Sequence, residues 1–159
     1  MVDNSFQIYL NKDSNKLPPI LEEATRTFKI NFPDNNYTLY DFESLDELIR
    51  NKIGSDAYKA FNKLMPLAYK ADFGKYCIGY LYGGWYADIT IKFIQGIKLN
   101  KTDFLCFCDC GDGVFKPWTL PYPIATSLFY AEAKSKILEK AIEIVIENCK
   151  NENYGVTPI

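Results

Sequence analysis

Histidine is absent from this chain of 159 residues, which therefore offers neither an imidazole metal ligand nor a histidine general base. An excess of positive charge is absent as well: 18 basic residues stand against 20 acidic ones, and the basic residues form no run. The basic surface that nucleic acids and anionic membranes attract is thus missing. We expect no nucleic-acid partner.

Long apolar runs are missing too. The N-terminus, MVDNSFQIYL, has no charged leader followed by an apolar stretch, and no run elsewhere approaches the length that crosses a bilayer. We therefore expect a cytoplasmic protein with no membrane span in this chain.

The five cysteines are an odd number in a chain without a secretory signal, which indicates reduced thiols. Three of them, Cys106, Cys108 and Cys110, alternate along the chain and could offer soft ligands to zinc or copper. The same alternation places them on one face of a strand, and the run FLCFCDC is apolar enough to be buried. Because the chain has no histidine and no Cys-x-x-Cys partner, we favour the structural role.

The chain does contain enough apolar surface for a folded core. Hydrophobic residues make up 48% of it and aromatic residues 16%, which excludes a disordered chain. We predict one α/β domain over residues 1–159, in which ligands collect at the carboxyl ends of the strands. Predicted strands cover 6–10, 37–40, 86–93, 104–108 and 124–130; predicted helices cover 19–30, 45–53 behind a Ser44-x-x-Glu47 capping box, 56–82 with a break at Pro66, and 132–149.

The segment from Tyr69 to Thr90, YKADFGKYCIGYLYGGWYADIT, places a few polar groups at fixed points of an apolar helix, turn and strand. Apolar residues recur every three or four positions before Gly83-Gly84, a pair that can end a helix without a Cβ penalty. Asp72 and Lys75 are three positions apart and therefore share a helix face.

A strand is predicted directly after this turn. From Trp85 onward the apolar residues alternate with a period of two, which places Asp88 and Thr90 on the same strand face. One Gly-Gly turn would then bring this polar pair near the pair on the preceding helix.

Together these residues resemble the motif of the glycosyltransferases with a DXD sugar-binding region. This family includes capsular polysaccharide transferases, fungal initiating mannosyltransferases and, more distantly, the clostridial glucosylating toxins. The matching positions, with the family's spacing throughout, are Lys70, Asp72, Lys75, Tyr76, Gly83, Gly84, Tyr86, Asp88 and Thr90. Weaker matches cover most of the chain and include Gln7 and the Leu17-Pro18-Pro19 turn.

The resemblance implies a GT-A-like nucleotide-diphospho-sugar transferase fold, a Rossmann-like α/β sandwich. It assigns donor-sugar binding to Asp72, Lys75 and Asp88. It assigns nucleotide binding to Gln7 and to Tyr9, whose ring would stack on the donor base.

The resemblance also implies a divalent metal, Mn²⁺ or Mg²⁺, held by Asp88 and Thr90. Thr90 stands where the family has a second aspartate, and a neutral hydroxyl is a weak ligand for a hard cation, so we expect weak metal binding. Lys75 replaces the family's arginine, which keeps the charge but loses the planar fork that grips two oxygens. Family members usually continue beyond the Tyr-Gly turn, so we expect the fold to be incomplete at the C-terminus.

Each of these features also has a purely structural interpretation. Asp88 could be a solvated strand end, and Asp72 with Lys75 could be an ordinary surface ion pair, worth at most about 1 kcal/mol. The joint spacing favours the functional interpretation.

We therefore predict a glycosyltransferase that moves a sugar from a UDP- or GDP-sugar donor to a hydroxyl of a glycan or glycoconjugate acceptor, as in polysaccharide biosynthesis, and that retains the anomeric configuration. No residue can be named as nucleophile or base. The alternative is a catalytically reduced domain that binds sugar nucleotides or serves as an interaction module.

Overall fold

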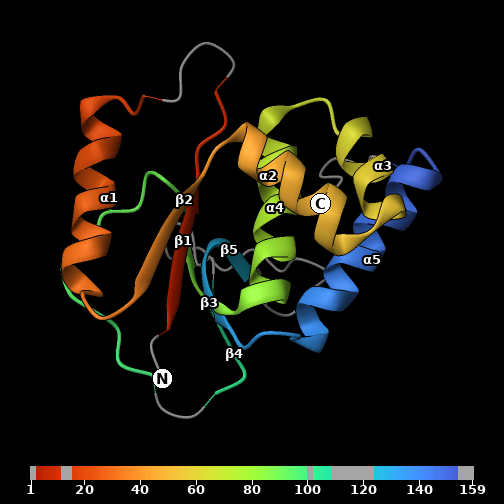
Figure 1. Ribbon diagram of the computed structural model, residues 1–159. Helices are drawn as coiled ribbons and strands as arrows, with labels where there is room; N and C mark the ends of the chain where they lie inside the picture. Colours follow the sequence, from red (N-terminus) through yellow and green to blue (C-terminus); the bar gives the residue numbers. More distant parts are fainter. Residues whose placement is uncertain (1–2, 12–15, 100–101, 109–123, 154–159) are drawn as a thin grey trace, which may run out of the picture.

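A five-stranded sheet with helices on both faces organises the chain in the computed structural model, which describes residues 3–11, 16–99, 102–108 and 124–153 (Figure 1). The elements in chain order are β1 (Asn4–Ile8), α1 (Pro19–Asn31), β2 (Asn36–Tyr40), α2 (Phe42–Leu48), a π-helical turn η1 (Ile49–Ile53), α3 (Ser55–Lys63), α4 (Leu67–Tyr82), β3 (Gly84–Ala87), β4 (Phe104–Cys108), β5 (Ile124–Ala131) and α5 (Lys136–Lys150). The predicted alternation of strands and helices is confirmed.

The strands lie in the order β2-β1-β3-β5-β4. β1 pairs in parallel with both β2 and β3, whereas β5 runs antiparallel to β3 and to β4. The carboxyl ends of β1, β2 and β3 therefore lie at one edge of the sheet together with the beginning of β5.

Side chains that alternate along the strands divide the apolar core between the two sheet faces. Trp85 and Ala87 pack with the α1 residues Phe28 and Phe32 on one face. Tyr86, on the other face, joins the larger cluster under α2 to α5. The face pattern predicted for the start of this strand is thus confirmed.

The predicted strand over residues 86–93 is wrong in its length, because β3 ends at Ala87. The backbone NH of Ile91 donates to the Asp88 carbonyl and closes a turn. Beyond it, Phe93 donates its backbone NH to Thr27 Oγ1 at 3.0 Å, and its carbonyl accepts from Asn31 Nδ2 at 3.2 Å. Two side chains of α1 thus take the backbone hydrogen bonds that a neighbouring strand would otherwise make. Phe93 is still buried, as the alternation of apolar residues predicts.

Two predicted helix starts also need correction. The helix predicted over 45–53 begins at Phe42, because Asp41 rather than Ser44 is the N-cap: Ser44 NH donates to Asp41 Oδ1, and Asp41 NH donates to Ser44 Oγ. The helix predicted over 132–149 begins at Lys136, because Lys134 adopts a positive φ of 65° that no helix accommodates. The predicted break at Pro66 is confirmed, since α3 ends at Lys63 and α4 begins at Leu67.

The cysteine strand is β4, but only part of its predicted burial holds. Cys106 packs against the larger core cluster, whereas Cys108 is exposed after a register shift between Cys106 and Phe107. Cys110 lies outside the described residues.

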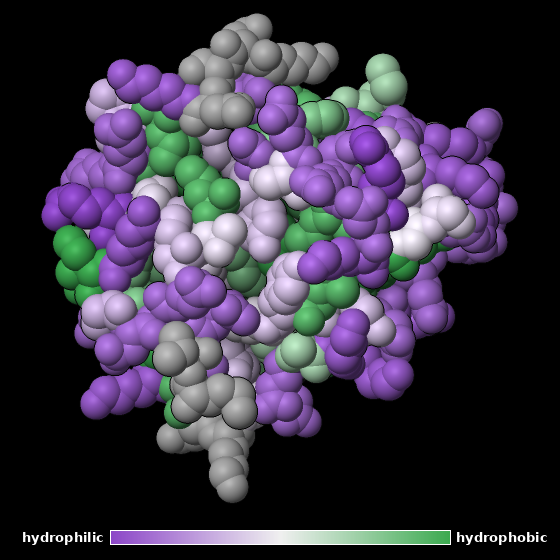
Figure 2. Space-filling model, in the orientation of Figure 1, coloured by the Kyte–Doolittle hydropathy of each residue, from purple (hydrophilic) through white to green (hydrophobic). Residues whose placement is uncertain are grey.

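Hydrophilic residues dominate the side of the molecule formed by α3 and α5, and paler and hydrophobic residues gather nearer the middle of the face, over β2 and α4 (Figure 2). None of the helices in the described ranges is long and apolar enough to cross a membrane.

Candidate functional site

The predicted donor residues meet at the carboxyl edge of the sheet, where the chain order of the strands reverses. β1 lies between β2 and β3, and the chain leaves β1 towards β2 before it returns to β3 on the other side. In open α/β sheets such a switch point opens a crevice that binds ligands. Because α4 runs into β3 through Gly83-Gly84, the first half of α4 lies beside the end of β3.

Lys75 is a buried cation with two partners. Its side chain is 1% exposed, and Nζ lies 2.5 Å from Asp72 Oδ1 and 3.2 Å from Thr126 Oγ1 at the start of β5. Asp72 keeps 36% exposure. The pair is therefore no ordinary surface ion pair: the carboxylate faces solvent while it neutralises a lysine inside the fold.

Asp88 directly follows β3 and accepts a hydrogen bond at Oδ1 from the hydroxyl of Tyr86, 2.5 Å away. Burial raises the pKa of Asp88, an effect opposed by the Tyr86 hydrogen bond and by nearby Lys75. Burial and the Asp88 carboxylate raise the pKa of Tyr86 well above its usual value, so its hydroxyl remains a proton donor.

Tyr76 joins the same cluster. Burial and, to a smaller extent, the charges of Asp72 and Asp88 raise its pKa to about 12, an effect that a hydrogen bond with Thr126 opposes. The negative charges of Asp72 and Asp88 thus both act on the Tyr76 hydroxyl, and Lys75 supplies one positive charge to the cluster. The formal charge of Asp72, Asp88 and Lys75 together is −1, which favours a cation at this edge.

Gln7 holds the backbone beside Asp88. It is 0% exposed, its Nε2 donates to the Asp88 carbonyl at 3.2 Å, and its Oε1 accepts from the Tyr37 hydroxyl at 2.9 Å. This chain of contacts runs from β2 through β1 to the end of β3 and fixes the three strands at the crevice. Direct contact of Gln7 with a nucleotide stays a prediction.

Tyr9 follows β1 at the same edge and is half-buried. Its backbone NH donates to the Tyr40 carbonyl at 2.9 Å, and its hydroxyl accepts from Asn11 Nδ2 at 3.0 Å. Tyr9 is thus anchored at this edge through its backbone and its hydroxyl, and the base stacking assigned to its ring stays a prediction.

Thr90 does not share a strand face with Asp88, as the sequence predicts, because both lie beyond the end of β3 and Thr90 is exposed in the turn. Among the described residues, no group of three or more His, Cys, Asp and Glu side chains is placed to hold a metal ion. A divalent cation bound through one carboxylate and the phosphates of its substrate needs no such group, and Asp88 fits that requirement.

Sequence reasoning missed Thr126, Tyr37 and Tyr76 as members of the site. Thr126 and Tyr37 lie on strands 51 and 30 positions away in sequence from their partners Lys75 and Gln7. No local pattern marks such residues. Tyr76, an aromatic beside Lys75, belongs to the motif, so its position carried a usable signal.

No family model matches this chain, and no curated protein matches it. Among solved structures, it is similar to one described as "PaToxG Glycosyltransferase", with a TM-score of 0.66 and 12% sequence identity. The similarity covers 98% of this chain and 64% of that one, so this chain spans less than two thirds of the glycosyltransferase chain it matches. At this identity the similarity concerns the fold alone, which is a GT-A-like α/β sandwich.

Proposed function

We propose that this chain is a glycosyltransferase domain of the DXD type, which binds a UDP- or GDP-sugar and transfers the sugar, with retention, to a hydroxyl of a glycan or glycoconjugate. One observation carries the proposal. Asp72, Lys75 and Asp88, which the motif assigns to the donor sugar, converge with Tyr86 and Thr126 at the switch point of a fold shared with a glycosyltransferase.

Each side chain has a task that its surroundings support. Asp72 is the exposed partner of its ion pair and is free to accept hydrogen bonds from sugar hydroxyls. Lys75, held by Asp72 and Thr126, orients that carboxylate and supplies positive charge near the phosphates. Tyr9 stacks on the base. Fixed in this way, the donor presents its anomeric carbon to the acceptor hydroxyl.

Transfer breaks the bond between the anomeric carbon and a phosphate oxygen and forms one to the acceptor oxygen, whose proton is released. A divalent cation at Asp88 would offset the charge that builds on the diphosphate leaving group. Tyr86 hydrogen-bonds one oxygen of Asp88 and leaves the other for this task.

The second candidate is a domain that binds sugar nucleotides without turnover. The exposed, neutral Thr90 favours it, because the second carboxylate of the motif is absent from the turn after β3. This candidate shares the donor site with the first and differs from it only in the chemistry.

The test is calorimetric titration of UDP- and GDP-sugars in the presence of Mn²⁺, combined with an assay for release of free sugar. We expect binding of one donor class, and we expect Tyr9→Ala to weaken it about 10-fold or more, because base stacking contributes ~1–3 kcal/mol. Tyr58→Ala on α3 is the matched control, since Tyr58 is also half-buried and also hydrogen-bonded through its hydroxyl.

Release of sugar together with binding supports the transferase, and binding without release supports the second candidate. Absence of binding to every donor, or binding that Tyr9→Ala leaves unchanged while Tyr58→Ala weakens it, contradicts the assigned site.

A further inference from the structure

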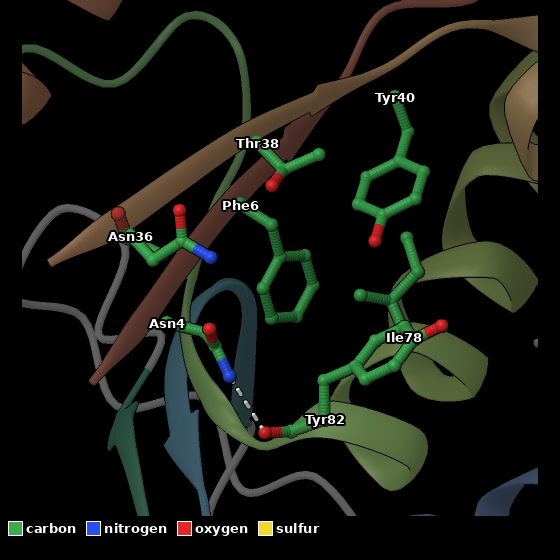
Figure 3. Close-up of a pocket in the computed structure, with 8 residues that line it drawn as sticks. Asn4, Phe6, Asn36, Thr38, Tyr40, Ile78 and Tyr82 are labelled. Atoms are coloured by element: carbon green, nitrogen blue, oxygen red, sulfur yellow. Dashed lines mark hydrogen bonds between the residues drawn. The ribbon is translucent and has the colours of Figure 1, made fainter. Parts of the chain in front are cut away.

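A groove separate from the donor crevice lies between the edge strand β2 and the second half of α4 (Figure 3). It holds about 150 Å³, close to the size of a cavity that accepts one benzene molecule. The rings of Phe6 and Tyr40 face Ile78 across it, and Asn4 and Asn36 stand at one end. On α4, the lining residues Ile78 and Tyr82 lie three and seven positions beyond Lys75, about 5 and 10 Å along the helix axis.

The lining combines flat apolar surface with neutral hydrogen-bonding groups. None of the eight lining residues carries a charged side chain. Burial, with a smaller contribution from nearby Tyr82, raises the pKa of Tyr40 to about 12, so its hydroxyl stays neutral. Within the described part of the chain, the side chains of Asn36, Thr38, Tyr40 and Tyr82 donate no hydrogen bond to another residue. These side-chain donors are therefore available to hydrogen-bond a ligand.

The walls of the groove are held in place without a ligand. Asn4 Nδ2 donates to the carbonyl of Tyr82 at 2.9 Å and ties β1 to the end of α4. Gly84 then packs so closely on Asn4 that an added Cβ would overlap the Asn4 carbonyl. Asn36 NH donates to the Asp3 carbonyl at 2.9 Å and fixes the start of β2. A preformed groove loses little entropy when it binds.

We propose that this groove is a second binding site, specific for one neutral pyranose ring, and thus a carbohydrate site distinct from the nucleotide-sugar site. A pyranose has an apolar C–H face that packs on the rings of Tyr82 or Tyr40. Its hydroxyls both donate and accept, which matches the amide of Asn36 and the hydroxyls of Thr38 and Tyr40. The neutral lining provides no counter-charge for a phosphate or a carboxylate, and the polar rim would leave its hydrogen bonds unmade around a purely aromatic ligand.

The site is tested by saturation-transfer NMR and calorimetry with methyl α-D-glucopyranoside, methyl α-D-mannopyranoside and N-acetylglucosamine. A ring of about a dozen heavy atoms should bind with a millimolar Kd. Asn36→Ala and Tyr82→Leu should each weaken this binding about 5-fold or more, the equivalent of one lost hydrogen bond or ring contact. Both residues are exposed enough for the fold to tolerate the change.

Tyr58→Leu is the matched control, because Tyr58 lies under Arg50 at 5.0 Å as Tyr82 lies under Lys52 at 5.7 Å. It should leave sugar binding unchanged. Three results would each overturn the proposal: no binding of any of the sugars, sugar binding insensitive to both groove variants, or preferential binding of benzyl alcohol or of UDP at this groove. The donor titrations above use a different site, so either proposal can fail while the other stands.

Discussion

Two parts of α4 contact the sheet in chemically different ways. The middle of the helix carries Asp72 and buried Lys75 next to Asp88, so its polar groups are charged and partnered by one another. The second half carries Ile78 and Tyr82, which face neutral side chains of β1 and β2 across the groove. One helix thus separates a charged crevice from an uncharged groove.

The charged crevice and the uncharged groove are therefore stabilised by different kinds of interaction. A buried charge needs a partner of opposite charge, so the crevice depends on specific pairs that burial makes costly to break. The groove depends on close backbone contact, with Gly83 and Gly84 at positive φ values of 63° and 105°. Backbone substitutions should therefore damage the groove end most, and charge substitutions the crevice end.

The largest effect is expected for Gly84→Ala. A Cβ there overlaps the Asn4 carbonyl and also meets a positive φ, so we expect a loss of at least about 3 kcal/mol in the free energy of unfolding, or failure to fold. Gly54→Ala is the control: its φ is 131°, but an added Cβ has nothing within 4 Å. It should cost only about 1 kcal/mol. Urea unfolding measures both, and equal losses would contradict the role of close contact.

The second-largest effect is expected for the ion pair between Asp72 and buried Lys75. Asp72→Asn removes the ion-pair partner of Lys75, so we expect a loss of about 2 kcal/mol, less than for a fully buried pair because Asp72 is 36% exposed and Asp88 remains nearby. The double variant Asp72→Asn/Lys75→Met removes both charges and should recover most of that stability without recovering donor binding.

Urea unfolding of the single and double variants tests this coupling. Asp56→Asn supplies the matched control, because its partners Lys59 and Lys150 are exposed and its loss should lower the midpoint far less than the loss of Asp72. A double variant no more stable than Asp72→Asn would show that the pair is not coupled.

The smallest effect concerns pH. Burial raises the pKa of Asp88, so the fold favours its protonated form: its contribution to stability is complete below the ordinary aspartate pKa and is lost as pH rises through the raised value. Asp88→Asn, which is neutral at every pH, should therefore raise the Tm at pH 7 by on the order of 2 °C and give no gain near pH 3.

The pH dependence of the Tm change expected for Asp56→Asn has the opposite sign. Lys150 and Lys59 lower the pKa of Asp56, so its contribution is present above the ordinary aspartate pKa and disappears as pH falls. A thermal melt series from pH 3 to 7 compares the two variants. If Asp88→Asn lowered the Tm at pH 7, the carboxylate would be stabilised by its partners after all.

Sequence alone predicts those features of the fold that depend on residues close together in the chain. The positions of Gly83, Gly84, Asp72 and Lys75 follow from helix periodicity and spacing, and the structure places them accordingly. Pro66 marks a helix boundary for an equally local reason.

What sequence could not supply depends on contacts between distant segments. The chain turns after Ala87, and Thr27 and Asn31 of α1 take the backbone hydrogen bonds of Phe93 beyond the turn, although the alternation of apolar residues continues. The burial of Lys75 likewise depends on Thr126. The roles assigned to Gln7, Tyr9 and Thr90 rest on family resemblance and stay predictions until donor binding is measured.

The hydrogen bond between Gln7 and the Asp88 carbonyl joins residues 81 positions apart, one on β1 and the other directly after the neighbouring strand β3. Opening the crevice therefore requires separation of β1 from β3, which dismantles the middle of the molecule. Local fraying cannot do this, so amide protons of Gln7 and Tyr86 should exchange with solvent only through global unfolding. If this edge binds the donor as proposed, the site lasts as long as the fold itself, and any adaptation to different sugars comes from the side chains around it.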